Sequence, residues 1–480
     1  MLALGLFVLG TRGITDPDFW WHLRNGQLIV QTHSVVRTDP YSFTKFGHRW
    51  INHEWLSDVL IFTVYRFGGF SGLILTFAAI TSAIFLLVYY RCPGRPDLAA
   101  LVTVWGAETS ILSWGVRPQM FTLLLAAIFL LILERSDQNP AVLWWTVPLT
   151  VLWVNLHAGY ALGISLLVLS LAGDVIEANF ASRASLRSSA SRRPLMLVIA
   201  ACLAVVPVNP NGFQLYAYPI ETLRSKAMQK YISEWFSPDF HAARYLLFLS
   251  MILVTLVLLP IGSQRPRTRE VVLLSATLLE ALRSVRHIPV FVLIAVPILC
   301  GLTEGCGVIR LSGQRRANLA PAGAVFKAFI LIALALFTLV RVRQVTREQA
   351  QLEAQHFPAG VVRFIRTAHP PEPILNHYNW GGYFIWKLYP NYRVFIDGRA
   401  DLYGDSFMQD LAATFYLTDD WQKTLKTWEI RTIVLPSDTP LVAGMELEPG
   451  WTRVYADSQA VVLTCDQANA GKSLKANALP

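Results

Sequence analysis

Charged residues are scarce in this 480-residue sequence. They make up 15% of it, whereas roughly 25% is usual for soluble globular domains, and 54% of the residues are hydrophobic. Cysteine is also rare, and no two cysteines have metal-ligand spacing: they are Cys92, Cys202, Cys300, Cys306 and Cys465. We therefore expect neither a disulfide framework nor a zinc site. A Walker loop, a dinucleotide fingerprint and a nucleophile elbow are missing as well. The composition predicts an α-helical polytopic membrane protein.

The net charge of +9 does not indicate a nucleic-acid partner. The basic residues lie mostly in short loops between apolar runs, and runs of about 20 apolar residues are typical of bilayer spans. The lipid bilayer is therefore the expected partner. The run from Met1 to Gly10 has no basic leader and no small-residue cleavage site, so it predicts a first span rather than a cleaved signal peptide.

Apolar runs bounded by turn signals predict about eleven transmembrane helices, which together form a transmembrane domain over residues 1–342. After Met1 to Gly10, the expected spans are Phe70 to Tyr90, Leu98 to Trp114, Met120 to Leu133, Val142 to Val154, Ala158 to Ile176, Leu195 to Val208, Tyr245 to Ile261, Val271 to Leu282, Pro289 to Leu302 and Val325 to Val340.

The arginines predict the orientation of these spans, because Lys and Arg in short loops stay on the cytoplasmic side. They fall in alternate loops: Arg91 and Arg95, Arg135, the group Arg183, Arg187, Arg192 and Arg193, then Arg265, Arg267 and Arg269, and finally Arg310, Arg315 and Arg316. The outside segments are then residues 11–67, the turns at Arg117 and His157, residues 209–244, the turn 283–287 and everything after Arg341. We look for function in these segments.

The first outer loop, residues 11–67, contains two stretches with apolar residues at helical spacing, Phe19 to Val30 and Trp55 to Phe67. Tryptophans accompany both stretches, and aromatic residues are typical of the headgroup layer. We therefore expect two interfacial helices lying along the bilayer surface.

From residue 343 to residue 480 the composition becomes that of a small extracytoplasmic soluble domain. A helix is predicted over Gln344 to Thr367, with further helical stretches near Trp380 to Leu388 and Asp419 to Trp428. Short strand-like runs are Pro373 to His377, Tyr392 to Ile396, Thr432 to Leu435, Thr452 to Ala456 and Ala460 to Leu463. These elements predict a small α/β domain with a sheet of four or five strands.

An acidic pair follows the first span directly, in Asp16-Pro-Asp18-Phe-Trp-Trp21-His22, and Trp21 and His22 of this motif are candidates to bind substrate. Two carboxylates at this spacing can converge on one cation or one substrate hydroxyl, and low-dielectric surroundings can raise a carboxylate pKa into the range of a general base. A purely structural interpretation is equally open: Asp18 caps the helix that begins at Phe19, and Asp16 makes an Asx turn.

Asn52-His53-Glu54-Trp55 heads the second interfacial helix. His53 and Glu54 are candidates to face the same cavity as the aspartates, although Asn52 also fits an ordinary helix cap, which is the favoured interpretation. Asn155 and His157, in the outer turn of a span, are candidates to contact a ligand, or to satisfy backbone groups at a tight turn.

Basic residues on the outer side indicate an anionic partner, because the positive-inside rule disfavours them there. They are Arg117, in the turn Gly115-Val-Arg-Pro, and Arg283, Arg286 and His287 in the turn before Pro289. The partner is either a protein carboxylate, with Glu280 at helical spacing from Arg283, or a lipid phosphate, which guanidinium binds bidentately.

Two motifs are the candidates within the soluble domain: Asn376-His-Tyr-Asn-Trp380-Gly-Gly-Tyr, and Phe395-Ile-Asp397-Gly-Arg399-Ala-Asp401-Leu-Tyr-Gly. The second follows a predicted strand, where loops commonly display polar groups. An Asp-Gly turn with an internal Asp–Arg ion pair accounts for it as well.

The acidic pair, the two interfacial helices, the many spans and the soluble C-terminal domain together resemble the GT-C superfamily of membrane glycosyltransferases, and within it protein mannosyltransferases, the aminoarabinose transferase of lipid A and RgtA/B/C/D-like bacterial enzymes. The resemblance implies a GT-C-like fold in the bacterial inner (plasma) membrane, with the soluble domain on the periplasmic side. Asn379-Trp-Gly-Gly-Tyr383 faintly resembles the acceptor motif of the oligosaccharyltransferase catalytic subunit but lacks its acidic residue and second Trp.

What the resemblance implies about function is an inverting hexosyl or pentosyl transferase that uses a polyprenyl-phosphate-linked sugar and a glycan, lipid or protein acceptor. Asp16 or Asp18 would be the general base, with a divalent cation, Mg²⁺ or Mn²⁺, at these aspartates if one is used. Arg286, Arg283 or Arg117 would bind the carrier phosphate. Two alternatives stay open: a flippase or transporter of lipid-linked sugars, for which we expect more polar groups within the spans, and a non-catalytic membrane scaffold, which needs no acidic pair.

Overall fold

A computed structural model describes residues 1–180, 189–262, 265–305 and 321–465. Several of the residues named above lie outside these ranges: Arg183, Arg187, Arg310, Arg315, Arg316 and Cys306.

The chain divides into two compact units, each built from separate stretches of sequence. The helical unit comprises Met1–Arg12, Gly68–Pro219 and Ile232–Arg347, and the sheet unit comprises Gly13–Phe67, Ile220–Tyr231 and Glu348–Pro480. The first outer loop thus belongs to the same unit as the C-terminal residues.

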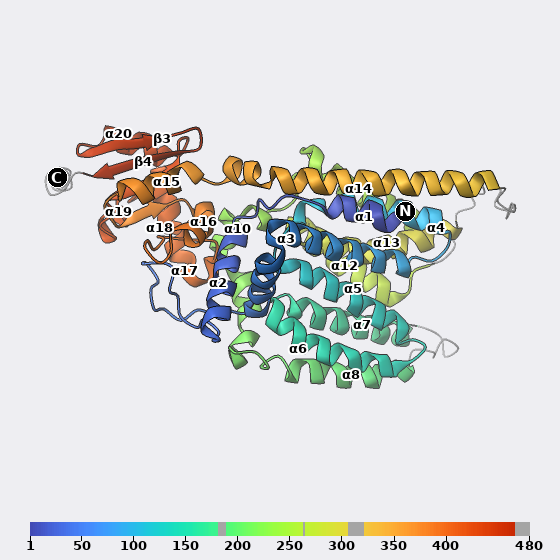
Figure 1. Cartoon of the computed structure of the whole chain (residues 1–480). Coiled ribbons are helices and arrows are strands. Elements are labelled where there is room, and N and C mark those ends of the chain that lie inside the picture. The colour runs from blue at the N-terminus through green and yellow to red at the C-terminus, as the bar shows by residue number, and fades with distance from the viewer. Residues whose placement is uncertain (181–188, 263–264, 306–320, 466–480) are drawn as a thin grey trace. The chain divides into compact units, whose positions relative to one another are not determined.

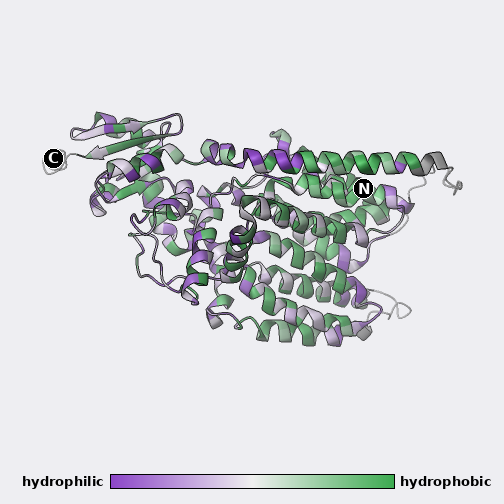
Figure 2. Cartoon of the chain, viewed as in Figure 1, coloured by the Kyte–Doolittle hydropathy of each residue, from purple (hydrophilic) through white to green (hydrophobic). Residues whose placement is uncertain are grey.

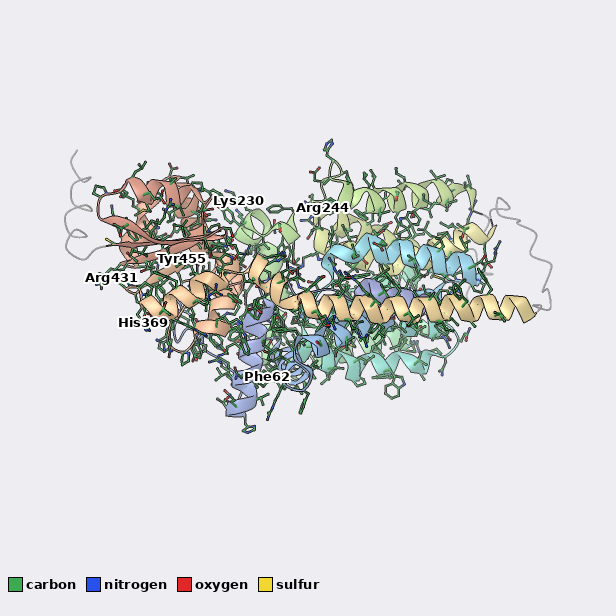
Figure 3. All side chains as sticks on the ribbon, turned by 45° about the horizontal axis from the view of Figure 1, so that its top comes forward. Phe62, Lys230, Arg244, His369, Arg431 and Tyr455 are labelled. Carbon is green, nitrogen blue, oxygen red and sulfur yellow. The ribbon has the colours of Figure 1, made fainter. Side chains whose placement is uncertain are left out.

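Apolar helices make up the helical unit, and Figure 2 shows hydrophobic residues along most of their length. They are α1 (Leu2–Gly10), α4 (Pro96–Ser110), α5 (Gln119–Arg135), α6 (Thr146–Leu156), α7 (Tyr160–Phe180), α8 (Ser189–Ala204), α11 (Leu246–Ile261), α12 (Thr268–Arg283) and α13 (Ile288–Gly305), with the larger parts of α3 (Trp55–Arg91) and α14 (Pro321–His356). Helix α7 lies against α12 and α8, and α13 packs on α4 and α12 (Figure 1). Side chains project from these helices into the space between them (Figure 3).

Five helical segments among the described residues are long and apolar enough to cross a membrane: Trp55–Arg91, Tyr160–Asn179, Ala243–Ile261, Val285–Glu304 and Val325–His356. Helices also occupy the other predicted spans, but they are shorter; α1, for example, has 9 residues. The chain is therefore a helical, multi-span membrane protein. The count of about eleven spans stays a prediction.

The two helices expected in the first outer loop are present in the sheet unit. They are α2 (Phe19–Thr32) and the first part of α3, which begins at Trp55. The helical path of α3 is interrupted at Gly69, whose φ of 58° and ψ of −155° suit glycine. The interruption comes where the chain passes from one unit to the other.

A four-stranded sheet with the order β1-β2-β4-β3 forms the core of the C-terminal part. Its strands are β1 (Ile374–Asn376), β2 (Thr432–Pro436), β3 (Trp451–Ala456) and β4 (Ala460–Cys465). Strand β1 runs parallel to β2, and the other pairs are antiparallel. The helices of this part are α15 (Ala359–Ala368), α16 (Gly381–Leu388), α17 (Ala400–Tyr403), α18 (Asp405–Tyr416), α19 (Gln422–Thr427) and α20 (Pro440–Leu447).

Four of the five predicted strands are confirmed, and the fifth, Tyr392 to Ile396, is wrong. The backbone of this segment bonds elsewhere: Phe395 N–H donates to the Asn376 side chain at 2.8 Å, and Val394 N–H donates to the carbonyl of Tyr41 at 3.0 Å. The predicted helix over Gln344 to Thr367 is in fact the end of α14 followed by α15, with Pro358 preceding α15 as its N-cap.

Candidate functional site

The first-loop aspartates stand at the start of α2 in the sheet unit. Asp16 Oδ1 accepts the backbone N–H of Asp18 at 2.9 Å, which is the Asx turn that the structural interpretation predicted. Asp18 occupies the N-cap position of α2, but its side chain makes no capping hydrogen bond. Both residues are partly exposed. The turn thus uses the Asp16 carboxylate, and Asp18 stands beside it at the head of α2.

Residues from the C-terminal part of the sheet unit lie directly against Asp18. A Cβ atom at Gly398 would lie 1.6 Å from Asp18 Oδ1, so only glycine allows this approach. Gly381 and Gly382 have a similar role, because Cβ atoms there would meet the carbonyl oxygens of Ile396 at 2.0 Å and Pro17 at 2.6 Å. The Trp-Gly-Gly motif therefore serves close packing of α16 against the Asp16–Asp18 turn and the segment 396–398.

Placing a methyl group at Gly398 should displace the Asp18 carboxylate without adding or removing charge. If Asp18 acts on substrate, Gly398→Ala should reduce activity by up to about 10²-fold, because a 1 Å misplacement of a reacting group can cost that much. Gly404→Ala is unsuitable as a control because Gly404 has a φ of 82°, whereas Gly68 has open space around it. Rates for Gly398→Ala and Gly68→Ala, measured side by side, check this prediction; equal rates would contradict it.

A buried network of acidic and histidine side chains lies between α2 and the first part of α3. His22 Nδ1 is 2.6 Å from Asp58 Oδ1, and Asn25 Nδ2 donates to Asp58 Oδ2 at 2.5 Å. Glu54 joins two histidines, because its carboxylate is 3.6 Å from His22 Nε2 and 3.2 Å from His53 Nε2. His22, His53 and Glu54 thus belong to one buried network.

The charges of this network favour protonated histidines. Burial alone would lower the pKa of His22, but the hydrogen bond and charge of Asp58, with the charges of Glu54 and Asp18, raise it above the usual value. Burial likewise opposes the charged form of His53, and Glu54 and Asp401 raise its pKa. Burial raises the pKa of Asp401 itself. The network therefore holds protons more tightly in the folded chain than in the unfolded chain.

Stability should consequently fall as the pH rises. A histidine with a raised folded-state pKa stabilises the fold fully below its unfolded pKa, about 6.5, and this contribution is lost as the pH rises through the folded value. We expect the Tm of the purified chain to decrease as the pH rises from about 6.5 through the raised pKa of the folded state. The decrease should be smaller in His22→Gln. His48→Gln is the control because His48 is exposed in the same loop. A pH profile of His22→Gln that matches the wild type would contradict this.

Arg399 forms a second buried cluster with two aspartates. It donates to Asp397 through Nε at 2.8 Å and Nη2 at 2.6 Å, and Nη2 is also 2.8 Å from Asp39 Oδ1. Burial opposes the charged form of Arg399, but Asp397 and Asp39 raise its pKa. The rings of Trp50 and Tyr41 lie 4.5 and 5.3 Å from the guanidinium carbon. The internal Asp–Arg pair expected from the sequence is present, and Asp39 adds to it.

Aromatic candidates of the sheet unit are buried. Trp21 is 6% exposed, and its ring lies 3.6 Å from that of His22 and 5.8 Å from that of Trp50. Trp380 is 7% exposed, and its ring lies 5.4 Å from that of His377. Both tryptophans therefore contribute to packing beside the polar clusters.

In the helical unit, Arg117 forms a bidentate ion pair with Glu234. Glu234 was not among the candidate residues predicted from the sequence. Glu234 belongs to η5 (Ser233–Trp235), and its backbone carbonyl accepts from Ser284 Oγ at 2.9 Å. Burial would raise the pKa of Glu234, but Arg117 and Arg286 lower it. The Arg286 guanidinium carbon lies 4.5 Å from the Trp235 ring centroid. Arg117 thus pairs with Glu234, and the charge of Arg286 acts on the same carboxylate.

A small cavity of about 40 Å³ opens beside this pair, and Arg286, Glu234 and Gln119 are among its lining residues. Arg283 is exposed and lies 3.7 Å from Glu280, at the spacing expected from the sequence, and His287 Nδ1 is 3.9 Å from the same carboxylate. Arg286 is therefore the basic candidate that lines this cavity.

Asn155 and His157 hold backbone together at the end of α6. Asn155 Nδ2 donates to the carbonyls of Val151 and Val208, each at 2.8 Å. His157 Nδ1 accepts from Gly159 N–H at 2.9 Å and is 2.8 Å from Thr122 Oγ1. These are the contacts expected from the backbone-satisfying interpretation of both residues.

No protein-family model and no curated protein matches the sequence. Solved structures do match the fold. The archaeal oligosaccharyltransferase AglB from Archaeoglobus fulgidus, in complex with an inhibitory peptide and a dolichol-phosphate, has a TM-score of 0.56 and 9% identity over 98% of this chain and 74% of that chain. The Archaeoglobus fulgidus oligosaccharyltransferase tethered with an acceptor peptide containing the NVT sequon has a TM-score of 0.54 and 10% sequence identity. This match also covers 98% of this chain and 74% of that chain. ArnT from Cupriavidus metallidurans, bound to undecaprenyl phosphate, has a TM-score of 0.48 and 14% sequence identity, over 98% of this chain and 97% of that chain.

The chain has a GT-C-like fold. The resemblance predicted from the first-loop aspartates and the spans is thus confirmed for the fold.

Asp16 and Asp18 are the residues that would hold the divalent cation implied by the resemblance. Among the residues that the structure describes, no three His, Cys, Asp or Glu side chains are placed to hold one metal ion. Asp16 instead accepts a backbone N–H. No step below is assigned to a metal.

Sequence reasoning missed three acidic residues of these clusters: Asp39, Asp58 and Glu234. The pattern that could have identified Asp58 is a carboxylate within an otherwise apolar helical stretch. Such a carboxylate becomes buried with the helix and then requires a polar or charged partner. Asp39 precedes a proline, as many turn residues do, and Glu234 lies in a long loop; neither pattern separates a buried carboxylate from an exposed one.

Proposed function

We propose that the chain is a membrane glycosyltransferase that moves a sugar from a polyprenyl-phosphate donor to a hydroxyl of a glycan, lipid or protein acceptor, with inversion at the anomeric carbon. The observation that carries this proposal is the likeness over 98% of the chain to an oligosaccharyltransferase described in complex with a dolichol-phosphate. The partly exposed Asp18 at the head of α2 supports it, because a general base must be reachable by substrate.

Asp18 is the proposed base. Its carboxylate takes the proton of the acceptor hydroxyl, the hydroxyl oxygen forms a bond to the anomeric carbon, and the bond from that carbon to the phosphate oxygen breaks. The polyprenyl phosphate leaves with the electron pair of that bond. Attack from the face opposite the leaving group inverts the configuration. The Asp16 turn and Gly398 hold Asp18 in place for this step.

Arg286 is the proposed ligand of the carrier phosphate, because guanidinium suits phosphate and Arg286 lines a cavity. The proposed location is the bacterial plasma membrane, with the sheet unit on the periplasmic side. The alternation of arginine-rich loops supports this orientation.

Removing the Arg286 charge should weaken donor binding more than it slows the chemical step. A hydrogen bond to a charged group contributes about 1.5–3 kcal/mol, so Arg286→Gln should raise the KM for a polyprenyl-phosphate sugar roughly tenfold or more. Arg283→Gln is the matched control, because Arg283 leaves the same turn and is 68% exposed. Equal changes in KM for both variants would argue against a phosphate at Arg286.

Purified protein in liposomes with a radiolabelled undecaprenyl-phosphate sugar tests the function. Transfer of label to an acceptor extract from the cell envelope is the expected result. Movement of the labelled lipid between leaflets without transfer would instead identify a flippase, and neither activity would favour a scaffold. The stereochemistry of the product, read by NMR coupling constants, tests inversion.

A further inference from the structure

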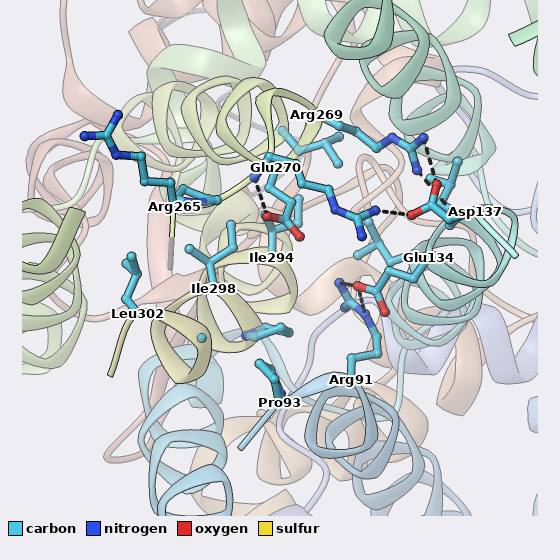
Figure 4. A pocket seen from close by; sticks show the side chains of 17 residues that line it. Arg91, Pro93, Glu134, Asp137, Arg265, Arg269, Glu270, Ile294, Ile298 and Leu302 are labelled. Carbon is cyan, nitrogen blue, oxygen red and sulfur yellow. Dashed lines mark hydrogen bonds and ion pairs between the residues drawn. The ribbon is translucent and has the colours of Figure 1, made fainter. Parts of the chain in front are cut away.

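A cavity of about 240 Å³ lies within the helical unit, among the ends of α3, α5 and α13 and the start of α12 (Figure 4). This volume is many times that needed by one water molecule. The helix ends around it adjoin loops rich in arginine, which the topology predicted from the sequence places opposite the outer loops. Neither the aspartates nor the arginine pair described above takes part in it.

Arginines and carboxylates alternate along one side of this cavity. Arg91 pairs with Glu134 at 2.8 Å, Arg269 pairs with Asp174 at 2.8 Å, and Arg267 pairs with Asp137. Each of these arginines therefore has a protein carboxylate. The pairs fix the positions of these charged groups, and the remaining charged lining residues are Arg265 and Glu270.

Arg265 differs from the other arginines around the cavity. It has no hydrogen bond or ion pair to the described residues, and Figure 4 shows it at the edge without a dashed line. Arg267, two residues further on, has a side chain that is 62% exposed. Both precede α12, whose start is capped by Glu270, because the Arg267 backbone N–H donates to Glu270 Oε2 at 2.8 Å. The Arg265 guanidinium is the cationic group at this edge that has no carboxylate among the described residues. This edge can therefore accept negative charge from outside the protein.

Apolar side chains line the rest of the cavity. They belong to α5, α12 and α13: Leu130, Leu133, Leu273, Ile294, Pro297, Ile298 and Leu302. A ligand that satisfies both sides needs an anionic group beside hydrocarbon. A phospholipid has this combination, and basic pockets between transmembrane helices bind anionic lipid headgroups.

We propose that this cavity binds the phosphate of an anionic phospholipid from the leaflet beside the arginine-rich loops, with Arg265 and Arg267 at the phosphate and an acyl chain along the apolar side. The site is independent of the glycosyltransferase reaction proposed above, and its ligand is a resident lipid rather than a substrate.

Native mass spectrometry of the purified protein with phosphatidylglycerol or phosphatidylcholine tests the proposal. We expect phosphatidylglycerol to bind more tightly, and Arg265→Gln/Arg267→Gln to weaken its binding roughly tenfold or more. The matched control is Arg192→Gln/Arg193→Gln, which removes the same charge from the start of α8, away from the cavity. Equal binding of the two lipids, or an equal loss in the control, would overturn the proposal.

A second variant fills the cavity without changing charge. Gly301 lines it, and a Cβ atom there would meet only Pro93 at an ordinary 3.5 Å. Gly301→Phe should therefore keep the fold and reduce phosphatidylglycerol binding. Inorganic phosphate should not displace the lipid, because it cannot cover the apolar side. Unchanged phosphatidylglycerol binding in Gly301→Phe would show that the lipid binds at the surface, outside the cavity. Displacement of the lipid by inorganic phosphate would show a site for free phosphate. Either result would overturn the proposal.

Discussion

Replacing Asp18 with asparagine should reduce sugar transfer by about 10² to 10⁴-fold, the usual contribution of a positioned general base. The amide is nearly the same size as the carboxylate but cannot accept the proton of the acceptor hydroxyl. Because Asp18 makes no capping hydrogen bond to α2, the helix loses no contact of that kind in the variant. Initial rates with a labelled polyprenyl-phosphate sugar, compared at equal amounts of folded protein, measure the effect.

Asp16→Asn separates the two aspartates. The asparagine oxygen can still accept the Asp18 N–H, so the turn should persist and transfer should fall much less than in Asp18→Asn. Asp419→Asn, at an exposed position of the same unit, controls for the loss of one negative charge. If Asp18→Asn retains full activity while Asp16→Asn does not, Asp16 is the base; full activity in both variants would end the assignment to this pair.

The sequence predicted those parts of the fold that depend on local pattern. Both helices of the first outer loop begin at the expected residues, Phe19 and Trp55, because apolar periodicity marks them. Strands β2 and β4 were recognisable for a similar reason, since they are short runs of β-branched and aliphatic residues. Helix α18 (Asp405–Tyr416) was not predicted, because it begins after Gly404 within a stretch of mixed composition.

The segment Tyr392 to Ile396 shows where local pattern is insufficient. Its residues suit a strand, yet Asn376 binds the backbone N–H of Phe395 and so occupies a donor that a sheet would need. This is a contact over nineteen positions of sequence, and no window of neighbouring residues reveals it. Pairing choices of this kind are decided by tertiary packing rather than by propensity.

The candidate site was predictable in its residue types but not in its pairings. His53 and Glu54 were candidates to face the same cavity as the first-loop aspartates, although a helix cap at Asn52 was the favoured interpretation. The partner of His22, Asp58, could not be assigned without the packing of α2 on α3. That packing depends on Gly26, where a Cβ atom would lie 2.0 Å from the carbonyl oxygen of Asp58. Sequence spacing along one helix does not report such an approach between two helices.

Arg399→Met should cause the largest loss of stability in the sheet unit. Asp39 and Asp397 are fully buried, and the variant leaves both without their cation. Breaking a buried ion pair by removing one partner costs about 3–5 kcal/mol, whereas the exposed pair of Arg453 with Glu446 should contribute about 0–1 kcal/mol. Chemical unfolding of Arg399→Met beside Arg453→Met, followed by tryptophan fluorescence, measures the difference. A loss no greater than that of Arg453→Met would show that the aspartates find other donors.

The same substitution should also slow transfer, because Arg399 is bonded to Asp397 on one side of Gly398, and Gly398 lies against Asp18. Arg399→Lys separates the two effects. The ammonium restores a positive charge between the carboxylates but cannot donate to both Asp397 oxygens in the planar arrangement that guanidinium provides. We therefore expect Arg399→Lys to recover part of the stability and less of the activity. If stability and activity recover to the same degree, the segment 397–399 needs only the positive charge of Arg399. The planar hydrogen bonds of the guanidinium would then have no part in positioning Asp18.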